Sequence, residues 1–169
     1  NSSLELPANI STYYNLRIDN NRNNDTRRII TNTQKLTIYN DFVLEDNTAV
    51  DNTLGEFRLF CDLDIRNDFR IEGGAEFEIQ NNASHEIRVG GNFEISDNYG
   101  FFTLLGNEIH NLYVSGNIVN NGNLNLDEGD ARMVRVHFIG NTNSTWTGGV
   151  DGVSGGEKSE LAQLIIDFD

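Results

Sequence analysis

The feature that most constrains the fold is a short phrase that recurs along the whole chain. The stretches 87–93, 112–118 and 136–142 are IRVGGNF, LYVSGNI and VHFIGNT. Each has an apolar pair two residues apart, then a spacer, Gly and Asn. Looser copies begin at residues 16, 36, 63 and 164, so successive copies start between 20 and 28 residues apart. Such a period indicates stacked repeats, each of which buries its apolar side against its neighbours.

The positions within the phrase predict a strand followed by a corner. Positions one and three are apolar in all seven copies, which is the alternation of a strand with one buried face. Position five is Asn in the first three copies and Gly in the next three, and position six is always Asn or Asp. We interpret this pair as a corner that needs a residue with positive φ, followed by a side chain that hydrogen-bonds nearby backbone.

The repeat predicts an all-β fold, a right-handed parallel β-helix of about seven coils that spans residues 1–169 as a single domain. Residues 1–13 match no copy and are a candidate cap, and 148–163 are a Gly-rich loop insertion. An antiparallel β-sandwich is the alternative, because its strands also alternate. The sandwich does not explain why the corner recurs in phase.

In a solenoid, equivalent residues of successive coils stack at the strand spacing of about 4.8 Å. The first predicted inward column is Leu36, Leu63, Ile87, Leu112, Val136 and Leu164. The second is Ile38, Ile65, Val89, Val114, Phe138 and Ile166, and the third is Phe42, Phe69, Phe93 and Ile118. A ladder along one corner would contain Asp41, Asp68, Asn92, Asn117 and Asn141, with the two carboxylates hydrogen-bonded to backbone.

The outward rows contain no cluster of carboxylates of the kind that glycan-cleaving enzymes need. The first row is Thr37, Asp64, Arg88, Tyr113, His137 and Ile165, and the second is Tyr39, Arg66, Gly90, Ser115 and Ile139. We expect an ion pair between Asp64 and Arg88, and a surface contact between Tyr113 and His137. We therefore predict that the chain is not an enzyme, and assign no catalytic, cofactor-binding or metal-binding residue.

Two features of the sequence are candidate metal sites. His85 and His110 hold the same repeat position and would lie about 5 Å apart on adjacent coils. No third ligand follows from the repeat, and Cys61, Val134 and Ala162 share their column, so packing is the better interpretation. Ca²⁺ remains a candidate cofactor at the acidic turns 45–47 and 127–130, although neither has the spacing of an EF-hand loop and GGVDGVSGG only faintly resembles a calcium-binding β-roll.

The charge, the lengths of the apolar runs, and the cysteine and aromatic content limit the kinds of partner that the chain can be expected to bind. The net charge of −14 repels phosphate backbones, so nucleic acid is not an expected partner. No apolar run approaches the roughly 20 residues of a membrane span, so membrane insertion is not expected. The one cysteine, Cys61, excludes an internal disulfide and is expected to be buried and inert. Trp146, with Tyr13, Tyr14 and Tyr99, is the candidate set for stacking on sugars.

The run LYVSGNIVNNGNLNL (112–126) resembles the repeats of large secreted Bacteroidetes proteins, including surface adhesins that are cargo of type IX secretion. The segments 136–140 and 164–167 resemble the later parts of the same repeat. The resemblance implies a right-handed parallel β-helix displayed at the cell surface. The sorting domain expected at the C-terminus of such cargo does not occur here, which fits a fragment of a longer chain.

These observations lead us to expect a non-catalytic extracellular module with a structural or adhesive role in a secreted or surface-displayed protein. Its expected partners are the remainder of the parent chain, secretion machinery, and surface glycans or proteins. Two alternatives stay open. One is a fragment of a β-helix polysaccharide lyase or hydrolase with its catalytic coils elsewhere, and the other is a carbohydrate-binding module that uses Trp146.

The corner assignment makes a prediction at Gly116. Replacing Gly116 with Val should lower the free energy of unfolding by more than about 1 kcal/mol, because a β-branched residue is strained at positive φ. Thermal or denaturant unfolding measures this change, and unaltered stability would contradict the assignment.

Overall fold

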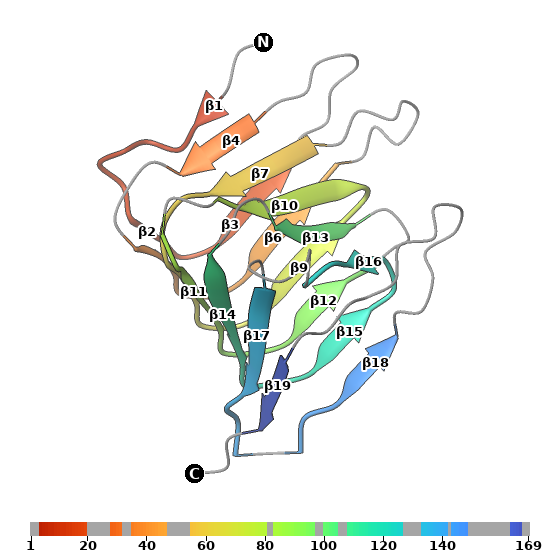
Figure 1. Cartoon of the computed structure of the whole chain (residues 1–169). Coiled ribbons are helices and arrows are strands. Elements are labelled where there is room, and N and C mark those ends of the chain that lie inside the picture. Colours follow the sequence, from red (N-terminus) through yellow and green to blue (C-terminus); the bar gives the residue numbers. More distant parts are fainter. Residues whose placement is uncertain are drawn as a thin grey trace.

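The chain forms a parallel β-solenoid with three sheets, seen in a computed structural model (Figure 1). The structure describes residues 4–19, 28–31, 35–46, 55–80, 83–96, 100–104, 108–126, 133–141, 143–148 and 163–166. We call the sheets A, B and C, in the order in which the chain visits them in each coil. The coils follow one another along the axis from the N-terminal end to the C-terminal end (Figure 1).

Each of the first six coils contributes one described strand to each sheet in turn, and β19 adds a seventh strand to sheet B. Sheet A contains β1 (Leu4–Glu5), β4 (Arg28–Thr31), β7 (Gly55–Leu59), β10 (Ala75–Ile79), β13 (Phe101–Leu104) and β16 (Asn123–Leu124). Sheet B contains β2 (Thr12–Tyr13), β5 (Leu36–Ile38), β8 (Leu63–Ile65), β11 (Glu86–Val89), β14 (Ile109–Val114), β17 (Met133–Phe138) and β19 (Gln163–Ile166). Sheet C contains β3 (Leu16–Asp19), β6 (Phe42–Glu45), β9 (Phe69–Glu72), β12 (Phe93–Ile95), β15 (Ile118–Asn120) and β18 (Trp146–Gly148).

The strand register confirms the predicted fold class and the three inward columns. All pairs between the described strands are parallel, which rules out the antiparallel sandwich. In sheet B, Leu63 pairs with Ile87, and Ile87 with Leu112. The predicted count of about seven coils is slightly too high. Among the described residues, sheets A and C have six strands and sheet B has seven, which corresponds to six coils of three strands and one further strand, β19.

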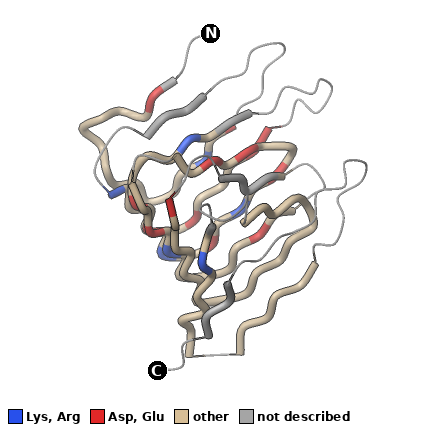
Figure 2. Tube along the Cα trace, viewed as in Figure 1, with Lys and Arg blue, Asp and Glu red and all other residues tan. Residues whose placement is uncertain are grey.

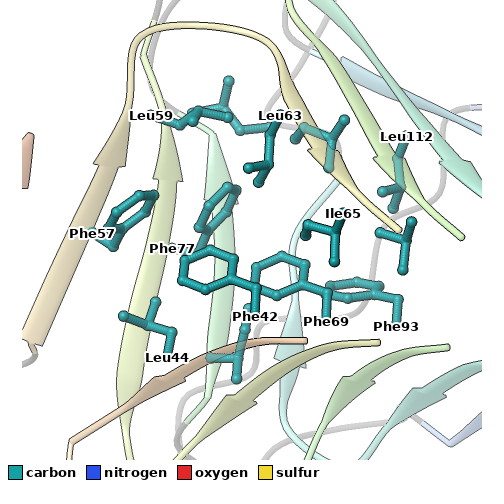
Figure 3. Close-up of a cluster of buried hydrophobic side chains, with 14 of the residues drawn as sticks. Phe42, Leu44, Phe57, Leu59, Leu63, Ile65, Phe69, Phe77, Phe93 and Leu112 are labelled. Atoms are coloured by element: carbon teal, nitrogen blue, oxygen red, sulfur yellow. The ribbon is translucent and has the colours of Figure 1, made fainter. Parts of the chain in front are cut away.

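Stacked phenylalanine rings fill the space between sheets A and C (Figure 3). The rings of Phe42 and Phe69 lie parallel with centroids 4.9 Å apart, and those of Phe69 and Phe93 are 5.2 Å apart. Phe57 and Phe77 of sheet A stack on each other and meet this row edge-on. All five side chains are fully buried, so the third predicted column is the centre of the core.

The prediction for the first copy of the phrase is wrong, because its strand belongs to sheet C and not to sheet B. Leu16 pairs with Phe42 in sheet C, whereas the counterparts of Thr37 and Ile38 in sheet B are Thr12 and Tyr13. The corner between Tyr13 and Leu16 has two residues instead of three, and residue 13 is aromatic. The pattern Leu-Arg-Ile at residues 16–18 therefore has the same alternation as the sheet B phrase, although it belongs to β3 of sheet C.

The corner between sheets B and C contains a ladder of side-chain oxygens. The Oδ1 atom of Asp68 accepts a hydrogen bond from the backbone N–H of Asn92 at 2.8 Å, and Oδ1 of Asn92 accepts one from the backbone N–H of Asn117 at 2.9 Å. Asp41 accepts from the backbone of Asp68 in the same way, which confirms that the carboxylates bind backbone. The top of the ladder differs from the prediction, because a longer corner in that coil places Thr145 over Asn117 in place of Asn141.

Each oxygen of the ladder also receives a side-chain donor, and this explains how positions five and six vary together. Where position six is Asn, its own amide donates, as Asn117 does to Asn92 at 3.1 Å. An Asp has no donor at that position when ionised. In the coil with Asp68, the preceding Asn67 supplies the amide and donates to Asp41 at 2.7 Å. The sequence pairs Asn-Asp and Gly-Asn are therefore two ways of providing one acceptor and one donor.

Gly116 is required for a different reason from the one proposed. Positive φ among the described glycines occurs at Gly73, Gly74 and Gly148, not at the corner glycines. A Cβ atom at Gly116 would lie 2.6 Å from the carbonyl oxygen of Gly91 and 2.7 Å from Oδ1 of Asn92. Gly116→Val is still expected to destabilise the fold, and Gly116→Ala should lose most of the same free energy because the first side-chain carbon makes the contact.

The two ends of the chain lie partly in the described region. Residues 4–5 and 12–13, within the candidate cap, form β1 and β2 of the first coil. Leu6 and Tyr13 pack against the core from this end. Of the loop insertion 148–163, the structure describes the two boundary residues, which end β18 and begin β19. Residues 149–162 lie outside the described part of the chain.

The ladder predicts a large difference between two substitutions of Asp68. Asp68→Ala removes the oxygen that accepts from the backbone and the side chain of Asn92, and should cost about 1–3 kcal/mol. Asp68→Asn keeps an oxygen of the same reach and is the matched control, with a much smaller expected loss. Urea unfolding of both variants measures the difference, and equal losses would contradict a role for the ladder.

Candidate functional site

The outward row of sheet B is the surface on which the sequence placed its candidate residues, and the register confirms the row. Thr37 pairs with Asp64, Asp64 with Arg88, and Arg88 with Tyr113. His137 continues the row on β17. These side chains therefore project from the same face on successive coils, as predicted.

The ion pairs on this face differ from the prediction. The carboxylate of Asp64 lies 3.0 Å from both Lys35 and Arg66, and is buried between them. Arg88 is bound to Glu86 at 3.0 Å and does not pair with Asp64. Two cations thus hold one buried carboxylate, and Figure 2 shows basic and acidic segments side by side along the coils. The carboxylates of Asp64 and Glu86 are therefore each bound by a cation.

The predicted contact between Tyr113 and His137 is confirmed as part of a longer stack. The ring centroids of Tyr113 and His137 are 4.5 Å apart, and the guanidinium of Arg88 lies 4.3 Å from the Tyr113 ring. Nε2 of His137 is 3.1 Å from the amide oxygen of Asn111. Both faces of the Tyr113 ring are therefore occupied by protein groups.

His85 and His110 stack inside the solenoid, as the packing interpretation requires. Their ring centroids are 5.6 Å apart and both side chains are buried. Nδ1 of His110 accepts a hydrogen bond from the backbone N–H of His85 at 3.1 Å, so the neutral ring carries its proton on Nε2. No group of three His, Cys, Asp or Glu side chains that could hold a metal ion occurs in the described residues. Cys61 is buried at the edge of the same core.

Burial keeps both histidines neutral. Burial, together with electrostatic repulsion from His85 when that ring is protonated, lowers the pKa of His110 to about 4. Burial also lowers the pKa of His85, although the carboxylate of Asp62, 3.7 Å away, opposes the shift. His110 therefore resists protonation in the range in which an exposed histidine would titrate, and the pKa of His85 is shifted in the same direction.

The structure describes only part of the turns that are candidate Ca²⁺ sites. Residues 127–130, 47 and 149–156 lie outside the described part of the chain. In the turn that begins at Glu45, both Glu45 and Asp46 are buried. Arg17 binds the Glu45 carboxylate with two hydrogen bonds of 2.8 and 2.7 Å, and this contact raises the pKa of Arg17. Glu45 is thus engaged by a cation of the protein itself.

The aromatic candidates separate into partly buried and exposed groups. Trp146 and Tyr13 are partly buried and pack against the core. Tyr99 lies outside the described residues. Tyr14 is 72% exposed, and Tyr39 on the next coil is 57% exposed. The sequence placed Tyr39 at the head of an outward row but missed Tyr14 as its neighbour, because the first copy of the phrase was assigned out of phase.

Comparison with known proteins finds no relative of this chain. The chain matches no protein-family model, no curated protein and no solved structure. Within its described residues no helix is long and apolar enough to cross a bilayer.

The histidine pair predicts a pH-dependent stability. The unfolded chain binds a proton at His110 near pH 6.5 and the folded chain only near pH 4, so stability falls as the pH drops through this window. Replacing His110 with Val, the residue at the next rung of its column, should reduce the loss between pH 7.5 and 4.5 by about 2–3 kcal/mol. Denaturant unfolding at the two pH values measures it. His137→Ala on the outer face is the control, and a His110→Val variant with unchanged pH dependence would refute the assignment.

Proposed function

We propose that this chain is a non-catalytic module of a secreted or surface-displayed protein, in which the solenoid serves as a stalk or an adhesive segment. The observation that carries the proposal is the unbroken parallel stack of sheet B, from β2 to β19. Neighbouring coils share backbone hydrogen bonds, stacked side chains and the corner ladder. A rod built in this way holds its outward rows at fixed spacing, which suits a spacer or a repeated contact surface.

Two further features support this choice over an enzyme. Glycan hydrolysis by the common mechanism requires two carboxyl groups that face the bond to be broken. On the described outer face of sheet B, the carboxylates of Asp64 and Glu86 are each bound by a cation. The stacked rings of Tyr113 and His137 also occupy one another. A lyase or hydrolase whose catalytic coils lie elsewhere in a parent chain is the competing proposal.

Extracellular placement is consistent with the composition and with the resemblance to surface adhesins. The only thiol, Cys61, is buried, so the fold neither depends on a disulfide nor exposes a cysteine to oxidants. The net charge of −14 favours solubility. On this proposal the partners are the rest of the parent protein, a secretion apparatus, and surface glycans or proteins.

Labelling of intact cells tests the proposal. An antibody raised against the purified chain should bind unbroken cells of the producing organism, or their culture medium, without permeabilisation. An antibody against a cytoplasmic protein is the control and should label only broken cells. Labelling of the chain that requires lysis would refute surface display. Release of new reducing ends from polysaccharides incubated with the purified chain would refute the non-catalytic assignment.

A further inference from the structure

The described residues include four exposed large apolar side chains, namely Ile10, Tyr14, Tyr39 and Ile139. Tyr14, Tyr39 and Ile139 belong to the second outward row of sheet B, where Tyr14 and Tyr39 are neighbours and Ile139 lies further along the row. Isolated exposed apolar residues need no explanation, but a grouping on one face indicates a contact surface.

Tyr14 and Tyr39 lie on adjacent coils. The backbone N–H of Tyr39 donates to the carbonyl of Tyr13 at 2.9 Å, and that of Asn40 donates to the carbonyl of Tyr14 at 2.7 Å. The two tyrosines are therefore one strand spacing apart, about 4.8 Å. Neither ring stacks on another ring or under a cation within the described residues, in contrast to Tyr113.

The surroundings of the two rings are polar, and the charged groups near them are bound in ion pairs. The corner beside them carries the amides of Asn15, Asn40 and Asn67. Asn40 donates one of its two amide N–H groups to Asn15, whereas Asn67 uses both of its N–H groups, to Asn40 and Asp41. Arg66, on the next coil of the same row, shares the single carboxylate of Asp64 with Lys35, so these three groups together keep one positive charge. We call the set Tyr14, Tyr39, Asn15, Asn40 and Asn67 the tyrosine–amide patch.

We propose that the tyrosine–amide patch binds an uncharged polysaccharide lying along the solenoid axis. Aromatic rings with free faces can pack on the C–H faces of sugar rings, and amide groups can hydrogen-bond to sugar hydroxyl groups. The patch therefore offers both the apolar and the polar contacts that a sugar makes. A chain of sugars can follow rings repeated from coil to coil. The protein charge of −14 disfavours a polyanion. This inference rests on the proposed adhesive function and names its ligand class.

Affinity electrophoresis of the purified chain tests the inference. Native gels would contain hydroxyethyl cellulose, barley β-glucan, xyloglucan or galactomannan as neutral probes, and polygalacturonate as the acidic probe. We expect at least one neutral polymer to slow the chain. The double variant Tyr14→Ala/Tyr39→Ala should lose about tenfold or more in affinity, because two stacking rings are removed. The double variant Tyr14→Phe/Tyr39→Phe keeps the rings and should retain binding.

Tyr113→Ala is the second control, since it removes a ring of the same face whose two sides are already covered. It should leave retardation unchanged, and thermal unfolding should show that every variant remains folded. The inference is overturned if no neutral polymer retards the chain, if retardation survives the loss of both rings, or if polygalacturonate alone binds. None of these results alters the labelling of intact cells, so failure here is distinct from failure of surface display.

Discussion

The structure depends on parallel hydrogen bonding between successive coils in one register. Once Leu63 pairs with Ile87, and Ile87 with Leu112, all neighbouring residues in those coils also stack on their counterparts. A parallel stack places like on like, so an apolar position must be apolar in each coil. This constraint explains why Phe42, Phe69 and Phe93 form one row of rings through the core.

The same register turns the corner into a chain of hydrogen bonds. Each corner oxygen meets the backbone N–H of the coil above, so a side chain of fixed length with an acceptor is needed at each level. A second donor is also supplied at each level, by Asn67 where position six is Asp68 and by Asn92 itself where position five is Gly91. The two sequence variants at the corner satisfy one geometric requirement, and glycine occurs where a Cβ would overlap the coil below.

Outward-facing positions need not hold similar residues in successive coils, so they differ from one coil to the next. On sheet B the outward rows contain a carboxylate shared by two cations, a stack of Arg88, Tyr113 and His137, and the exposed pair Tyr14 and Tyr39. The buried histidines, by contrast, belong to the packing of the interior. Their low pKa values couple folding to pH without forming a metal site.

The sequence by itself determined the parallel solenoid, its three inward columns and the contact between Tyr113 and His137, because these follow from a period that stacking makes visible. It did not determine the first coil, where a corner shorter by one residue let Leu16 imitate the wrong strand. Only the tertiary structure decided which charges pair, why Gly116 is needed, and that Tyr14 lies beside Tyr39. These features depend on how far side chains reach and on which residues meet between coils. The spacing of the repeat along the sequence does not specify either.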